Sequence, residues 1–451
     1  MAGAPARGAA DLPDYPRLLV IAPRPLDWEG GGGGVTMCNL LKGWPLDRIA
    51  QIHSDRQRLC GDPSICRHGF CFRASLGDEG GLPGGGPTEC LWTLARYAMR
   101  RKESWGPLSS LLWLLPRVRE FAPDVIYSYV LQAPAAYWTL PRRLAQALAV
   151  PYVTHMMDDW PALHDQHGGL LDRLFWRNVR RWSLRKLFHA ASGNIGICPE
   201  MCEAFAERYG CSFVPFHNCV EVQRYDGVGK SYAAKADGAF DLVYIGSVRQ
   251  LKELESLVDL KRAVLALAER VPGIRLTVHH PRFGEDISNF AEFLHAPPHV
   301  VSGDYLAPDE LPRRLVEADA LVVPLGFVGD TLTYLRYSFQ TKVPEYLASG
   351  TPVLVYGPAA SPNTLAARRD GWGLVVDRQE PSLLASALAD LVDKEELRRA
   401  LGTRGREVAG EFYDAKRVRE EFRHFLASRM GLPGDSVDRD ASGPDRGLGK
   451  R

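Results

Sequence analysis

The chain has 451 residues, of which 45% are hydrophobic and 24% charged, and 55 Lys and Arg against 54 Asp and Glu give a net charge of +1. This composition is typical of a soluble globular protein and excludes a largely disordered, collagen-like or small disulfide-bonded chain. The even charge balance argues against a dedicated nucleic-acid binder, which would carry a large basic excess. At roughly 150 residues per domain, the length predicts two or three domains.

The 9 cysteines are irregularly spaced, and residues 1–16 lack the apolar segment of a secretory signal. Reduced thiols in a cytoplasmic protein are the simplest interpretation. The tightest group, Cys60, Cys66, His68 and Cys71, has no CxxC pair, so loop thiols are favoured over a zinc site. No apolar run approaches the ~20 residues that a transmembrane helix needs.

The first ordered elements have the pattern of a βα unit. Residues 17–23 form a short apolar run typical of a buried parallel strand, a glycine run at 30–34 follows as a predicted loop, and residues 35–43 have helical character. Later runs, with helical stretches between them, predict strands at 124–129, 151–155, 193–198 and 212–216. We therefore predict a disordered tail at 1–15 and a Rossmann-like, acceptor-side domain at 16–222.

A second alternation of strands and helices begins at residue 240 and predicts another α/β domain, at 223–410. An amphipathic helix at 411–430 is expected to cross back to the first domain, with Phe412 among its apolar residues, and 431–451 to be a disordered tail. The predicted fold class is α/β, with two doubly wound domains facing each other across a cleft. Such sheets bind ligands at the carboxyl ends of their strands.

The strongest local motif is YSFQTKVPEYLASGTPVLVYGP at 337–358. Thr341 can cap a helix with Pro344 in its first turn, and Gly350 can end it. A helix N-terminus favours a diphosphate, and Glu345 beside it could accept both hydroxyls of a ribose. The alternative is an ordinary connection between a well-capped helix and a strand, with Glu345 only complementing the helix dipole.

The second motif is YIGSVRQLK at 244–252, in which Gly246 and Ser247 end a strand and Arg249 and Lys252 follow. Two cations at the carboxyl end of a strand can neutralise a departing diphosphate. Solvated cations at the start of a helix are the alternative.

Together these motifs resemble the family-4 type of retaining, nucleotide-sugar-dependent glycosyltransferases with the GT-B fold, a group that includes the "glycosyltransferase family 1" enzymes of polysaccharide assembly. The resemblance covers about residues 17 to 430. It implies that Arg249 and Lys252 hold the donor's diphosphate and that Glu345 holds the nucleotide ribose. Gly246 and Ser247 match the positions at which, in the family, the strand before this basic pair ends beside the donor.

The same resemblance extends to the first domain. It implies that the glycine loop, Gly32, Gly33 and Gly34, lies under the donor phosphates or the acceptor, and that His155 hydrogen-bonds the donor sugar. Ser338, Thr341 and Lys342 resemble an S-x-P-T-K variant in which Gln340 replaces the proline, with Lys342 as a further phosphate contact. One departure is Tyr337, which stands where the family often has the first of two acids.

The implied activity is transfer of a hexose from a nucleoside-diphosphate sugar to an acceptor hydroxyl with retained anomeric configuration, in cell-surface polysaccharide or glycolipid assembly. The implied partners are a nucleotide sugar and a glycan or lipid-linked acceptor, with no nucleic acid. The resemblance implies no cofactor and no essential metal.

Other functions stay open at this point. A nucleotide-sugar epimerase shares the two-domain layout, and the glycine run with Asp55 allows an NAD(P)-dependent oxidoreductase. A non-catalytic protein with a decayed site is a third class. Asp158 and Asp159 could bind a metal, although a loop on the acceptor side or a helix cap fits adjacent aspartates better.

Two basic stretches with tryptophans, at 92–102 and 170–188, suit peripheral contact with an anionic membrane. Solvated helix faces over a core stripe explain the pattern equally well. The expected location is the cytoplasm, with the inner face of the plasma membrane as the site of any peripheral contact.

Overall fold

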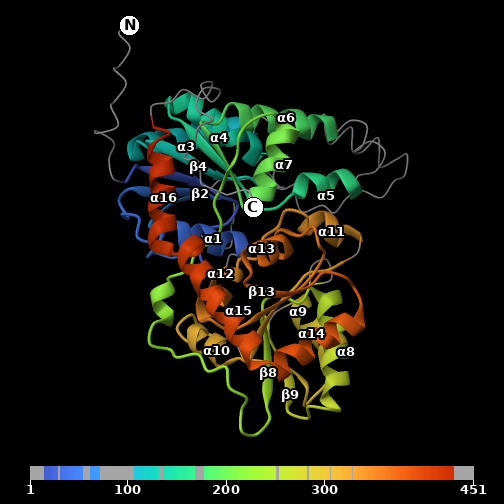
Figure 1. The fold of residues 1–451 in the computed structure, drawn as a ribbon. Coiled ribbons are helices and arrows are strands. Elements are labelled where there is room, and N and C mark those ends of the chain that lie inside the picture. The colour runs from blue at the N-terminus through green and yellow to red at the C-terminus, as the bar shows by residue number, and fades with distance from the viewer. Residues whose placement is uncertain are drawn as a thin grey trace. The chain divides into compact units, whose positions relative to one another are not determined.

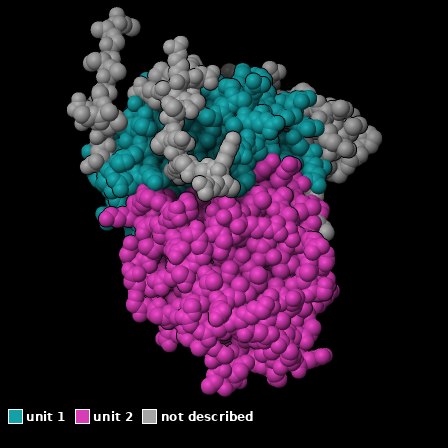
Figure 2. Space-filling model, viewed as in Figure 1, with its two compact units in different colours: residues 1–216, 419–451 teal, residues 217–418 magenta. Residues whose placement is uncertain are grey.

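The computed structural model describes residues 15–28, 31–53, 61–71, 106–131, 136–167, 177–249, 253–281, 284–304, 306–327 and 329–430. The chain divides into two compact units, coloured separately in Figure 2. Unit 1 comprises residues 1–216 and 419–451, and unit 2 comprises residues 217–418.

Unit 1 is built on a parallel sheet with the order β3-β2-β1-β4-β5-β6-β7 in its described residues. The strands are β1 (Leu18–Ile21), β2 (Ile49–His53), β3 (His68–Cys71), β4 (Val125–Tyr129), β5 (Tyr152–Met156), β6 (Gly193–Gly196) and β7 (Val214–Pro215). The helices are α1 (Gly31–Leu41), α3 (Gly106–Phe121), α4 (Ala136–Leu148), α5 (Trp160–His167), α6 (Arg177–His189) and α7 (Pro199–Tyr209).

Unit 2 repeats this topology with the described order β10-β9-β8-β11-β12-β13. Its strands are β8 (Phe240–Ile245), β9 (Ile274–His279), β10 (Val300–Ser302), β11 (Ala320–Pro324), β12 (Val353–Tyr356) and β13 (Gly373–Val376). Its helices are α8 (Leu254–Ala268), α9 (Glu285–Asn289), α10 (Leu311–Glu317), α11 (Gly329–Leu335), α12 (Val343–Ser349), α13 (Pro362–Asp370), α14 (Pro381–Asp393) and α15 (Glu395–Val408), with shorter turns η3 (Val222–Tyr225), η4 (Phe290–Leu294) and η5 (Ala409–Tyr413).

Both sheets have the doubly wound order, so the predicted α/β fold class is confirmed (Figure 1). The apolar runs read from the sequence are the central strands: every residue of β1, β4 and β11 is buried. Helices cover parallel sheets on both faces, which is why these strands are apolar throughout instead of alternating. The strand order changes direction between β1 and β4 in unit 1 and between β8 and β11 in unit 2.

The last described helix, α16 (Ala415–Ala427), completes the core of unit 1. Phe422 is fully buried, and its ring centroid lies 5.4 Å from that of Tyr127 and 5.3 Å from that of Phe216. Arg419 Nε donates a hydrogen bond of 2.6 Å to the carbonyl of Asn39. Phe412, expected on the same apolar face, instead lies in η5 and is 45% exposed, because the helical phase breaks before α16 begins.

His217, directly after unit 1, is a half-buried titrating group in unit 2, and its Nε2 atom is buried. Its ring lies 4.3 Å from that of Phe339, its Nδ1 lies 3.1 Å from the Asn218 carbonyl oxygen, and burial lowers its pKa to about 4. In the unfolded chain the pKa returns to about 6.5. Because the folded pKa is the lower one, the unfolded chain binds the extra proton. The stability that neutral His217 contributes is complete above pH 6.5 and is lost as the pH falls towards 4.

We therefore predict that His217 accounts for a loss of about 2 kcal/mol of stability between pH 7 and pH 5. Urea unfolding of the parent protein and of His217→Gln at both pH values measures this. The variant should lose about that much less than the parent over the interval. Equal losses in the two proteins would show that His217 does not titrate in this way.

Candidate functional site

The loop after β8 lies at the switch point of the second sheet, where open α/β sheets bind ligands. The Gly246 amide donates a hydrogen bond of 2.9 Å to the carbonyl of His279 at the end of the neighbouring strand. The Tyr244 hydroxyl reaches forward and donates a 2.7 Å hydrogen bond to the carbonyl of Ser247. These bonds fix the start of the loop that carries Gly246, Ser247 and Arg249.

Two side chains of α9 hold the remainder of this loop. Asp286 Oδ1 accepts a hydrogen bond of 2.5 Å from the Val248 amide, and Asn289 Nδ2 donates one of 2.6 Å to the Val248 carbonyl. Arg249 Nε lies 4.0 Å from Asp286 Oδ2, and the Arg249 side chain is 51% exposed. Arg249 is thus tethered at one end, with its guanidinium accessible to a ligand.

The start of α12 packs directly on the end of β8. The hydroxyl of Tyr346 accepts a hydrogen bond of 2.9 Å from the Ile245 amide. Lys342 Nζ lies 4.1 Å from the centre of the Tyr244 ring, and a methyl group at position 246 would collide with both Lys342 Nζ and the Tyr244 hydroxyl. The two predicted motifs therefore meet here, and the absence of a side chain at Gly246 makes room for the Lys342 ammonium.

The helix boundaries around Lys342 agree with the prediction except at the cap. Pro344 lies in the first turn of α12, and Gly350 ends the helix with φ of 72°. The N-cap position is occupied by Lys342, without a side-chain cap, so the predicted capping role of Thr341 is wrong. Thr341 instead offers its carbonyl to Asn218 Nδ2 at 2.7 Å, because the turn begins one residue later than the Thr-Pro spacing indicates.

Two side chains of η3 hold the carboxylate of Glu345. The Tyr225 hydroxyl donates a hydrogen bond to Glu345 Oε2, and Arg224 Nη1 lies 3.7 Å from Oε1. Burial and the neighbouring carboxylate raise the pKa of Tyr225 well above its usual value, so its hydroxyl stays protonated and donates. The Glu345 side chain is 18% exposed, which leaves part of the carboxylate open to a ligand.

The predicted glycine loop is helical. Gly32, Gly33 and Gly34 lie in the first turn of α1, which begins at Gly31. A methyl group at position 33 would lie 2.6 Å from the Tyr129 hydroxyl, so the run permits close packing of a helix on β4. The other predicted cation, Lys252, lies outside the described residues.

His155 occupies the interior of unit 1, which differs from the expected contact with a donor sugar. Its side chain has no exposed surface, and a hydrogen bond of 2.6 Å joins its Nδ1 to the Tyr127 hydroxyl oxygen. Burial raises the pKa of Tyr127, which keeps that hydroxyl protonated. The His155 ring packs against the ring of Tyr127, which in turn packs against Phe422, so His155 belongs to the core.

Asp159 forms an ion pair rather than part of a metal site. It is 1% exposed and accepts hydrogen bonds of 2.7 Å from both Nη1 and Nη2 of Arg208. It also accepts a hydrogen bond from the Ala162 amide in the first turn of α5, as a helix cap does. Within the described ranges, no three His, Cys, Asp or Glu side chains gather as metal ligands would.

Comparison with solved structures finds the same two-domain architecture. The Anabaena protein HepE in complex with UDP and glucose has a TM-score of 0.61 at 14% identity, over 92% of this chain and 100% of HepE. A sucrose-phosphate synthase from Thermosynechococcus elongatus scores 0.59 at 15% identity, over 91% and 99%. A glycosyltransferase from Rickettsia africae scores 0.62 at 9% identity, over 92% and 98%. The protein thus has the GT-B fold of glycosyltransferases.

The family model of the glycosyl transferase 4-like domain matches residues 68–219, within and just beyond unit 1. The resemblance to glycosyltransferases of this type, inferred from the motifs, is therefore confirmed. No curated protein sequence matches the chain. None of the helices in the described part of the chain has the length and apolar character that a membrane span requires.

Proposed function

We propose that the protein is a retaining glycosyltransferase that moves a hexose from a nucleoside-diphosphate sugar to an acceptor hydroxyl in cell-surface polysaccharide or glycolipid assembly. The observation that carries the proposal is the convergence of Lys342 on Gly246 at the switch point of unit 2. The family match supports the class of reaction, and UDP in the HepE structures supports a uridine nucleotide as the first donor to test.

In this proposal the donor's diphosphate lies against the β8 loop, with Arg249 and Lys342 as its cations and Lys252 as a third. Fixed positive charge at a developing phosphate charge lowers the barrier without reorganisation of water. The bond from the anomeric carbon to the diphosphate oxygen breaks while the acceptor oxygen bonds to the same face. The acceptor proton passes to the β-phosphate of the leaving group. These steps are assigned without a cofactor or an essential metal.

Thermal unfolding with UDP, GDP, dTDP, CMP and NAD, without added metal, tests the donor site. A ligand that binds only the folded protein must raise the melting temperature. We expect a shift with one nucleoside diphosphate and a loss of affinity of about tenfold in Lys342→Ala, the size of one hydrogen bond to a charged group.

The matched control is Lys394→Ala, because Lys394 is 58% exposed in unit 2 and pairs only with Asp390 in the described chain. It should bind the nucleotide as the parent does. A shift with NAD alone would identify an oxidoreductase, and equal affinity in parent and Lys342→Ala would refute the site. Incubation of the donor sugar without acceptor separates an epimerase, which converts the donor by itself.

A further inference from the structure

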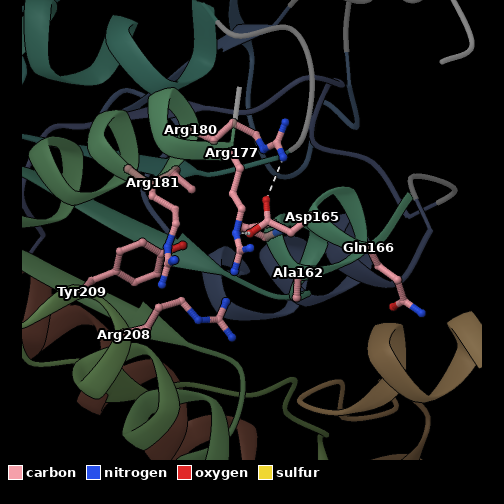
Figure 3. A pocket seen from close by; sticks show the side chains of 10 residues that line it. Ala162, Asp165, Gln166, Arg177, Arg180, Arg181, Arg208 and Tyr209 are labelled. Atoms are coloured by element: carbon pink, nitrogen blue, oxygen red, sulfur yellow. Dashed lines mark hydrogen bonds and ion pairs between the residues drawn. The ribbon is translucent and has the colours of Figure 1, made fainter. Parts of the chain in front are cut away.

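Unit 1 contains a pocket of about 340 Å³ between α5, α6 and α7, and none of the residues that line it is assigned to the donor (Figure 3). Four arginines line it: Arg177, Arg180 and Arg181 from α6 and Arg208 from the end of α7. Asp165 of α5 and Tyr209 are also in the wall. A concave site with this many guanidinium groups differs from a solvated basic helix face.

Among the residues that the structure describes, two carboxylates pair with arginines of the pocket. Asp165 Oδ1 accepts a hydrogen bond of 2.7 Å from Arg180, and its Oδ2 lies 3.1 Å from Arg177 Nε. Arg208 pairs with buried Asp159, as described above. Arg181 makes no ion pair or hydrogen bond with any residue that the structure describes. The pocket therefore has an excess of positive charge, and α6 itself contains no Asp or Glu to offset it.

The wall is rigid on the side of α6 and α7. Arg180 is 8% exposed and is oriented by Asp165, while Tyr209 is 2% exposed. Burial raises the pKa of Tyr209 to about 12, so its hydroxyl stays protonated. Figure 3 shows Arg181 and Arg208 near Tyr209, and Asp165 beside Arg177 and Arg180. Arg180 and Arg208, each held by a carboxylate, can therefore donate to an anion without first having to become ordered.

We propose that this pocket binds a phosphate or diphosphate group. Guanidinium groups offer pairs of parallel N–H donors that match phosphate oxygens, and several of them around one cavity favour an anion with more than one charge. The group could belong to a soluble phosphate compound or to a lipid headgroup. Trp182 on α6 is 59% exposed, and Lys186 Nζ lies 3.7 Å from the centre of its ring. An exposed tryptophan beside a lysine suits a helix that faces a membrane surface. The inference rests on unit 1 alone and does not depend on the proposed donor site.

The first test is calorimetric titration of the full chain with inorganic pyrophosphate at constant ionic strength. Arg181→Ala should weaken binding by about tenfold, because it removes a charged donor with no structural partner. Arg185→Ala is the matched control, since Arg185 is an exposed arginine one turn further along α6 and is not in the pocket wall. It should bind within about twofold of the parent. The proposal would be overturned if the parent does not bind pyrophosphate. It would also be overturned if both variants weaken binding equally, because that result indicates nonspecific attraction of the anion to the charges of α6.

A second experiment identifies the source of the phosphate and separates this site from the donor site. Phosphatidylcholine vesicles containing phosphatidic acid, which exposes a phosphate monoester, are compared with vesicles containing phosphatidylglycerol. If vesicles with phosphatidic acid retain the parent and Arg185→Ala but not Arg181→Ala, the phosphate belongs to a lipid headgroup. If the variants differ in this way in the pyrophosphate titration but not on the vesicles, the phosphate belongs to a soluble compound.

Two variants make the failures of the two sites distinguishable. Lys342→Ala should weaken UDP binding and leave the Arg181-dependent binding of pyrophosphate intact. Arg181→Ala should leave the UDP-induced thermal shift intact. If Arg181→Ala and Lys342→Ala weaken both ligands alike, a separate site in unit 1 is refuted.

Discussion

Replacement of Arg208 by alanine should destabilise the protein by about 3–5 kcal/mol, the usual cost of removing one partner from a buried ion pair. Asp159 is 1% exposed, and both of its carboxylate oxygens accept hydrogen bonds of 2.7 Å from Arg208. In the variant this carboxylate would keep the Ala162 amide but lose its cation. An unpaired carboxylate in the interior costs far more than one at the surface.

Urea unfolding of the parent, of the single variants Arg208→Ala, Arg208→Lys, Asp159→Ala and Arg185→Ala, and of one double variant measures this effect. Arg208→Lys keeps the charge but cannot make two parallel hydrogen bonds, so its loss should be smaller than that of Arg208→Ala. The double variant Asp159→Ala with Arg208→Ala should lose less than the sum of the single losses, because neither charge is then left alone. Arg185→Ala, an exposed arginine, should stay within about 0.5 kcal/mol of the parent. A loss below about 1 kcal/mol in Arg208→Ala would mean that the pair behaves as a surface ion pair.

Much of the fold could be predicted from local sequence because its signals are local. Fully apolar strands such as β1 and β11 must be covered on both faces, and alternation with helices then gives two parallel sheets. The ends of α12 follow from Pro344 and Gly350, whose backbone preferences act within one turn. The motif after β8 could also be placed, because a ligand loop at the carboxyl end of a strand is a property of this topology.

The contacts that set the environment of each candidate residue could not be predicted in this way. Whether His155 faces a ligand or the core depends on Tyr127, which belongs to another strand. Asp286 holds the β8 loop from a short helix far along the chain, and its sequence surroundings are those of an ordinary polar surface turn. The glycine run was compatible with a loop or a helix, and packing against Tyr129 decided it. Each of these outcomes depends on a contact between residues far apart in the sequence, and the spacing of residue types does not reveal such contacts.

Glu345→Ala should lower kcat/KM by about a hundredfold to ten-thousandfold in the proposed transfer reaction. If the carboxylate accepts both hydroxyls of the nucleotide ribose, its removal costs two hydrogen bonds to a charged acceptor, each worth about 1.5–3 kcal/mol. Tyr225 and Arg224 hold the carboxylate in place, and the Glu345 side chain is 18% exposed. Initial rates with the donor found by thermal shift measure the loss, and transfer at the parent rate would refute the ribose assignment.

Tyr225 should act as a positioning residue, because its side chain is fully buried and its hydroxyl holds Glu345, through which it would act on the proposed ligand. Tyr225→Phe keeps the ring and removes the hydroxyl, so we expect KM for the donor to rise about fivefold with kcat nearly unchanged, as loss of one orienting hydrogen bond predicts. Tyr356→Phe is the matched control, since its hydroxyl donates a 3.0 Å hydrogen bond to another carboxylate of unit 2, that of Asp259. A rise in KM confined to Tyr225→Phe assigns the effect to the orientation of Glu345. Equal changes in the two variants would instead indicate a general loss of stability in unit 2, which their urea midpoints would record.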